Sequence, residues 1–172
     1  MSMSSAAINT FEIQLKALAR LLDKAEAHAT AKKFDVAVLL NSRLAPDMLP
    51  LTGQVQLACD FARRGAARLA GLEPGSVEDK ETTIAELKER IDNTIAFVKS
   101  VDPVAIDASA KRVITLPLGP NAKGEMTGAD YLNHFVLPNF YFQSTIAYAI
   151  LRHNGVELGK LDFMHGVPLK RV

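Results

Sequence analysis

Apolar residues recur at intervals of three and four along four separate stretches of this 172-residue chain. Because that interval follows the 3.6-residue turn of an α-helix, each stretch predicts a helix with one buried face. The first predicted helix spans residues 5–32 and the second residues 48–69. The third begins at Thr82 or Thr83 and ends near Ser100, and the fourth runs from beyond Thr127 to His153. The pattern therefore predicts an all-α domain.

Residues at the ends of these stretches are those that begin and end helices. Asp47 is a plausible N-cap for the second helix, and Gly71 is a stop signal behind it. Thr83 and Glu86 have the spacing of a capping box at the start of the third helix. The glycine of Asn154-Gly155 ends the fourth.

The fourth helix contains a proline well inside its predicted length. Pro138 has no N–H for the carbonyl of His134, so we expect a kink there and another partner for that carbonyl. The kink would turn Asn139 toward the bundle axis. The predicted buried stripe of this helix is Leu132, Phe135, Asn139, Phe142, Ile146, Ala149 and His153.

The long crossover between the third and fourth helices lacks the helical pattern and is typical of strands and turns. Residues 112–118 form a β-branched run, and a turn rich in glycine, proline and asparagine follows at 119–124, which together predict a small hairpin. The apolar tail at 156–172 is expected to pack on the bundle or on a partner. We therefore predict one domain over residues 1–172, a four-helix bundle with a small β-hairpin before its last helix.

Composition excludes several classes of function. Twenty basic and nineteen acidic residues leave a net charge of +1, which argues against a nucleic-acid partner. No apolar run approaches the ~20 residues of a membrane span, so no membrane association is expected. A single cysteine, Cys59, and the absence of a secretion signal at the N-terminus favour a cytoplasmic location.

The histidines and the cysteine of this sequence do not form a recognisable catalytic or metal-binding pattern. No two of the four histidines are spaced as metal ligands, and Cys59, in mid-helix beside Asp60, is interpreted as a small buried hydrophobe. The charged face of the third helix, which includes Arg90, is interpreted as a solvated surface. Phosphate-binding glycine motifs are absent from the sequence.

The most unusual feature is a pair of amides on the fourth helix. Asn139 and Gln143 lie one turn apart, with Tyr148 nearby, and Gln54, Gln56 and Asp47 of the second helix are possible partners. Buried amides need hydrogen-bond partners, because an unsatisfied buried polar group costs about 1–3 kcal/mol. Two interpretations stay open: a polar network that fixes the helix register, and the polar floor of a ligand pocket.

Three strings of this sequence, Leu39–Met48, Leu137–Phe142 and Ala149–Val156, resemble an uncharacterised branch of the DinB-like superfamily. The resemblance covers nearly the whole chain and implies a DinB-like four-helix bundle, which agrees with the periodicity. It also implies a homodimer.

The resemblance raises the question of a metal. Many DinB-like proteins hold a divalent ion with one histidine on the second helix and an H-x-x-x-H pair on the fourth, and some use it in thiol transfer or hydrolysis. The corresponding pair here is Asn139 and Gln143, and residues 48–60 contain no histidine. Neutral amides, with Asp47 or Asp60 in addition, suit zinc and nickel poorly. We therefore predict no metal and no cofactor.

The leading hypothesis is a bundle that binds a small ligand, without a metal, at Asn139, Gln143, Gln54, Asp47 and Tyr148. One alternative is a metal-dependent transferase or hydrolase of DinB type. A second is a structural homodimer with a vestigial pocket. In the metal-free hypotheses, the amides hydrogen-bond to each other, to Tyr148 or to water.

Overall fold

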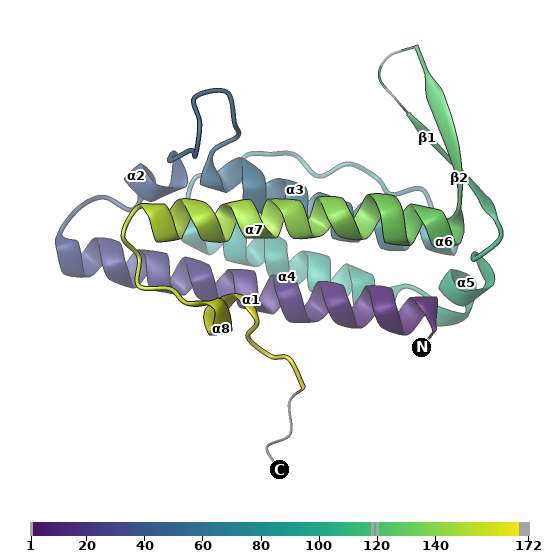
Figure 1. Cartoon of the computed structure of the whole chain (residues 1–172), viewed down its shortest axis with the longest axis horizontal. Coiled ribbons are helices and arrows are strands. Elements are labelled where there is room, and N and C mark those ends of the chain that lie inside the picture. The colour runs from purple at the N-terminus through teal and green to yellow at the C-terminus, as the bar shows by residue number, and fades with distance from the viewer. Residues whose placement is uncertain (1, 118, 120, 169–172) are drawn as a thin grey trace.

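Four long helices pack side by side into a bundle (Figure 1). The computed structural model describes residues 2–117, 119 and 121–168. The long helices are α1 (Met3–Lys32), α3 (Leu51–Ala70), α4 (Ile84–Ser100) and α7 (Leu137–His153). The shorter elements are α2 (Ala37–Leu40), α5 (Pro103–Ala108), β1 (Val113–Pro117), β2 (Lys123–Thr127), α6 (Gly128–Asp130), η1 (Tyr131–Val136) and α8 (Lys160–Phe163). The predicted all-α bundle with a hairpin in its last crossover is confirmed.

The buried faces of the first three long helices follow the predicted stripes. One contiguous cluster of buried apolar side chains includes Phe11 and Leu15 of α1, Val55 of α3 and Leu87 and Ile91 of α4. Among the described residues, no helix is both long and apolar enough to cross a lipid bilayer.

The ends of the helices follow the predicted signals, with one exception. The Thr83 hydroxyl accepts the Glu86 N–H at 3.2 Å and the Glu86 carboxylate accepts the Thr83 N–H at 3.0 Å, which completes the capping box. Asp47 does not cap α3: it is exposed in the preceding loop, and Pro50 is the N-cap. A proline disfavours helical geometry in the residue before it, so α3 cannot begin before Pro50.

The fourth helix has a different buried face from the predicted one. Within η1, the Leu137 N–H donates to the Leu132 carbonyl five residues back, which is the bonding of a π-helix. This wider turn shifts the phase of α7, and Phe142 is 55% exposed. The residues that α7 buries are Phe140, Gln143, Ser144, Ala147, Ile150 and Leu151.

Pro138 lies in the first turn of α7, directly after the π-helix. Asn139 is half-buried, and its amide donates to the Phe135 carbonyl at 2.7 Å. A side chain therefore bonds a backbone carbonyl beside the proline, but the carbonyl is that of Phe135, one residue beyond His134.

The hairpin and the tail lie outside the four-helix core. β1 and β2 pair antiparallel, with Val113 opposite Thr127, and the hairpin projects from the bundle at the end where α5 and α6 lie (Figure 1). The tail returns along α1, where Lys24 pairs with Asp162 of α8 at 2.6 Å. This confirms that the tail packs on the bundle as far as it is described; residues 169–172 lie outside the described part.

Candidate ligand-binding site

Three of the predicted site residues, Gln54, Asn139 and Gln143, lie on α3 and α7, which pack against each other. Gln143 is 8% exposed and Gln54 is 2% exposed. The Gln54 amide nitrogen donates to the Leu49 carbonyl at 3.0 Å, and its buried oxygen has no hydrogen-bond partner among the described residues. The amide nitrogens of Gln54 and Asn139 thus bond backbone carbonyls, whereas the expected partners were another amide, Tyr148 or water.

The other two predicted residues lie elsewhere. Asp47 is exposed in the loop before α3. Tyr148 follows Asn139 by nine residues, or two and a half helical turns, so it lies on the opposite side of α7. Its ring packs edge-to-face on Phe163 of α8, with the ring centroids 5.8 Å apart. The five predicted residues therefore do not line one site.

A pocket of about 230 Å³ lies between α3, β1 and η1, one turn along the last helix from Asn139. We call it the Tyr131 pocket. It lies where the hairpin meets the bundle, because β1 buries Leu116 at this end of the molecule. Its lining is Leu57, Asp60, Phe61, Arg64, Arg68, Leu116, Pro117, Tyr131 and Phe135.

Aromatic rings form one wall of the Tyr131 pocket. Tyr131, only 1% exposed, stacks on Phe135 with centroids 5.7 Å apart, and Phe61 packs edge-to-face on Phe135 at 6.1 Å. The Arg68 guanidinium donates to the Tyr131 hydroxyl oxygen at 3.3 Å. Burial raises the pKa of Tyr131 despite the opposing effect of Arg68, so the phenol stays protonated at neutral pH and can donate a hydrogen bond.

Two arginines also line the pocket, and they differ in whether an ion pair neutralises their charge. Arg64 forms an ion pair with Asp60, with its Nη2 atom 2.8 Å from Oδ2. Arg68 forms no ion pair with any of the residues that the structure describes. Because Arg64 and Arg68 are one helical turn apart on α3, both guanidinium groups reach the same cavity.

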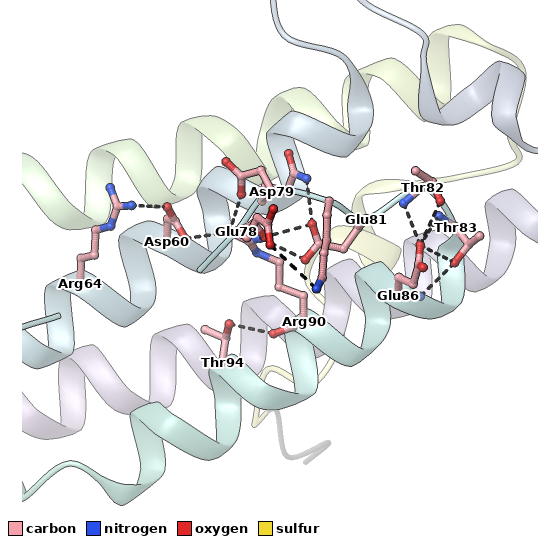
Figure 2. Close-up of polar contacts among 12 residues, drawn as sticks. Asp60, Arg64, Glu78, Asp79, Glu81, Thr82, Thr83, Glu86, Arg90 and Thr94 are labelled. Atoms are coloured by element: carbon pink, nitrogen blue, oxygen red, sulfur yellow. Dashed lines mark hydrogen bonds and ion pairs between the residues drawn. The ribbon is translucent and has the colours of Figure 1, made fainter. Parts of the chain in front are cut away.

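Asp60 also belongs to an ion cluster inside the bundle, in which its second carboxylate oxygen is paired (Figure 2). The second Asp60 oxygen, Oδ1, lies 2.9 Å from Nη2 of Arg90 on α4. Arg90 also pairs with Asp79 at 2.9 Å and with Glu81 at 3.0 Å, both in the segment that joins α3 to α4. We call this segment, residues 72–83, the α3–α4 strap. The cluster thereby fixes Asp60, and through it Arg64.

Arg90 is not part of a solvated face as predicted, because it is only 5% exposed. It borders a larger pocket of about 400 Å³ between the strap and α4. The cations Arg63, Lys80 and Arg90 and the anions Glu81, Glu86 and Glu89 line that pocket, so their charges balance. Glu86 is also occupied by the helix cap. We therefore regard the Tyr131 pocket as the better candidate site.

Cys59 lies fully inside the bundle. Burial raises the pKa of its thiol to about 12, and the hydrogen bond with Thr94 only partly offsets this. Such a thiol stays protonated and unreactive at neutral pH, as expected of a small buried hydrophobe.

The donors at the expected metal positions do not fit a zinc or nickel ion. Asn139 and Gln143 offer neutral amides, and the Asn139 nitrogen already bonds a carbonyl of its own helix. Within the described residues, no group of three or more histidine, cysteine, aspartate or glutamate side chains could hold a metal ion. Zinc and nickel favour imidazole or thiolate donors, which this region does not supply.

The sequence did not single out Tyr131, Arg64 and Arg68, which line the candidate site, or Arg90, which is paired with Asp60. The i, i+4 spacing of Asp60, Arg64 and Arg68 on α3 was a readable signal of a charged row. The π-helix that contains Tyr131 has no comparable pattern in the sequence.

The fold is that of a DinB-like four-helix bundle with a small hairpin. A crystal structure of a DinB family member protein from Shewanella denitrificans matches with a TM-score of 0.91 and 40% identity. The match covers 98% of this chain and 95% of that one. The chain belongs to the family described as domain of unknown function (DUF1993), which matches residues 3–164. None of the curated proteins matches it.

Proposed function

We propose that this protein binds a small organic molecule in the Tyr131 pocket without a bound metal. The observation that carries the proposal is the composition of the lining, in which aromatic and aliphatic side chains surround two guanidinium groups and a phenol. Such a mixture of an apolar wall and a few convergent polar groups is typical of ligand pockets. The volume of about 230 Å³ suits a single ring or a short chain, since drug-sized ligands occupy about 300–1,000 Å³.

Asn139 supports this pocket from its own helix. Its amide bonds the carbonyl of Phe135, a residue of the aromatic wall, directly before the proline turn. Asn139 thus helps to shape the pocket, whereas Tyr131, Arg64 and Arg68 make the polar contacts with the ligand.

Filling each pocket in turn tests the proposal. Leu57→Trp places a large ring in the Tyr131 pocket, and Asn93→Trp does the same in the larger pocket as a matched control. Phenol, benzamide and benzoate at millimolar concentration are the probes, and NMR line broadening of the probes is the measurement. We expect broadening with the wild type and Asn93→Trp, and none with Leu57→Trp. Equal broadening with all three proteins, or with none, would refute the proposal.

Metal analysis tests the alternative of a metal-dependent transferase or hydrolase. After purification without chelators or metal affinity resin, we expect far less than one zinc or nickel ion per chain. One ion per chain that disappears in Gln143→Ala would restore the metalloenzyme hypothesis. A metal that Gln143→Ala leaves in place would locate the ion elsewhere.

A further inference from the structure

We infer that the ligand of the Tyr131 pocket is a carboxylate, a monoanion with a compact apolar body. This inference rests on the proposed function and adds the chemical class of the ligand. It depends on three observations: the charge of the lining, the free hydrogen-bond capacity of Tyr131 and the occupation of Asp60.

The lining of the pocket has a net positive charge. Its ionised groups are Arg64, Arg68 and Asp60, which sum to +1. Because the Arg64 charge is paired with Asp60, the surplus is located at Arg68. A guanidinium group presents N–H donors in a planar fork that matches a carboxylate, and it keeps its charge at any physiological pH.

The Tyr131 hydroxyl adds a second donor beside Arg68. Its oxygen accepts from Arg68 at 3.3 Å, and its proton has no acceptor among the described residues. Tyr131 lines the pocket, although only 1% of the residue is exposed. A ligand oxygen beside both groups would accept from the phenol and from a second N–H of the guanidinium, and charge-assisted bonds of this kind are stronger than neutral ones.

Asp60 cannot neutralise Arg68 in place of a ligand. One of its oxygens is paired with Arg64 and the other with Arg90. Arg90 is itself held by Glu81 and Asp79 of the strap (Figure 2), which keeps it in position. Among the residues that the structure describes, the cluster thus leaves Arg68 as a pocket cation without a counter-ion. One surplus charge matches a monoanion better than a phosphate dianion.

The apolar part of the ligand would face the other side of the pocket. Phe61, Phe135 and Leu57 come from the helices, and Leu116 and Pro117 come from β1. Such walls lower the local dielectric constant and strengthen the attraction between the anion and Arg68. A ring or short branched chain fits the remaining volume.

A comparison of matched probes tests the inference. Benzoate, benzamide and phenyl phosphate share the ring and differ in charge, and their dissociation constants are measured by NMR titration of the wild type. We expect benzoate to bind about tenfold more tightly than benzamide, because its bonds to Arg68 and Tyr131 are charge-assisted. Benzoate should also bind more tightly than phenyl phosphate.

Two variants locate the effect. Arg68→Gln should remove the preference for benzoate, so that benzoate and benzamide bind with similar dissociation constants. Arg63→Gln is the matched control, since Arg63 is on the same helix but stacks on Phe97 and lines the other pocket. It should keep the full preference. Thermal unfolding of both variants checks that they fold.

The outcomes separate the two proposals. If benzamide binds as tightly as benzoate and Leu57→Trp abolishes both, the pocket stands and the carboxylate inference is wrong. Tighter binding of phenyl phosphate than of benzoate, or a full benzoate preference in Arg68→Gln, would also overturn it. If no probe binds, both proposals fail.

Discussion

Arg90 shows how one residue connects several parts of this fold. Its guanidinium group lies inside the bundle and meets carboxylates from α3 and from the α3–α4 strap. It also donates to the Glu78 carbonyl at 3.1 Å, while its Nε atom has no partner among the described residues. A buried charge of this kind is retained only when its partners are fixed around it.

We predict that Arg90→Ala destabilises the protein by about 3–5 kcal/mol, because Asp60 and Glu81 lose the buried cation that joins them, although Asp60 keeps its ion pair with Arg64. Urea unfolding followed by circular dichroism gives the free energy of unfolding. The control is Lys88→Ala on the same helix, which removes the surface pair with Asp23 and should cost less than about 1 kcal/mol. Similar losses in the two variants would show that the cluster contributes no more than a surface pair.

At the scale of elements, the contact between α3 and η1 depends on a glycine. A Cβ atom at Gly65 would lie 2.6 Å from Cγ1 of Val136, closer than real side chains approach each other. The absence of that atom lets the π-helix approach α3 beside the Tyr131 pocket.

We predict that Gly65→Ala destabilises the protein by about 1–3 kcal/mol, the usual cost of overpacking a core. In a Val136→Ala background the obstacle is gone, so the same substitution should become neutral or stabilising through the higher helix propensity of alanine. A double-mutant cycle of unfolding free energies measures this change of sign. An equal cost in both backgrounds would contradict the proposed contact.

The α3–α4 strap is held by a carboxylate with a lowered pKa. Burial, the largest single influence, raises the pKa of Glu81, but hydrogen bonds from Gln56 and Arg90 outweigh it and bring the pKa below the usual 4.5. The folded state therefore binds the proton less readily than the unfolded state does. This contribution to stability is present above about pH 4.5 and is lost as the pH falls through the folded pKa.

We predict that the stability difference between the wild type and Glu81→Gln shrinks as the pH is lowered from 6 to about 3. Unfolding free energies of both proteins across this range give the difference directly. Glu12 lies away from the strap and also has a lowered pKa, which hydrogen bonds from Lys16 and Lys99 cause, so Glu12→Gln should show the same trend and is a positive control. A difference for Glu81→Gln that is constant across the range would disprove the role of its carboxylate.

At the scale of the whole molecule, we propose a homodimer. Several large apolar side chains stay exposed on α7 and on the tail, namely Tyr141, Phe142, Leu161, Met164 and Val167. Two-fold dimers are the commonest assembly of soluble proteins, and exposed apolar patches often mark an interface.

Sedimentation equilibrium at micromolar concentration should give about twice the chain mass of 18.7 kDa. Phe142→Lys should shift the protein toward the monomer, since burying a lysine at an interface is costly. Val104→Lys, at an exposed position on α5, is the control and should leave the dimer intact. A monomer mass for the wild type would refute the proposal.

Local pattern determined most of the fold. The three-and-four periods of α1, α3 and α4 predicted their buried faces, because an apolar stripe has one energetically favourable orientation. The Thr83 and Glu86 capping box and the stop at Gly71 predicted helix ends, because these signals act within one turn of the chain. A second local rule, that a proline disfavours helical geometry in the residue before it, explains why Asp47 does not cap α3.

Tertiary structure decided the site. The phase of α7 depends on the π-helix before Pro138, so the sequence alone misplaced Phe142 and did not single out Tyr131. Nothing in the sequence of α4 distinguishes Arg90 from the other charged residues of that helix. It is buried because the strap folds over it and brings Glu81 and Asp79 to its guanidinium group. The partners of a pocket or a buried ion come from segments distant in the chain, and no periodicity within one segment encodes which segments will meet.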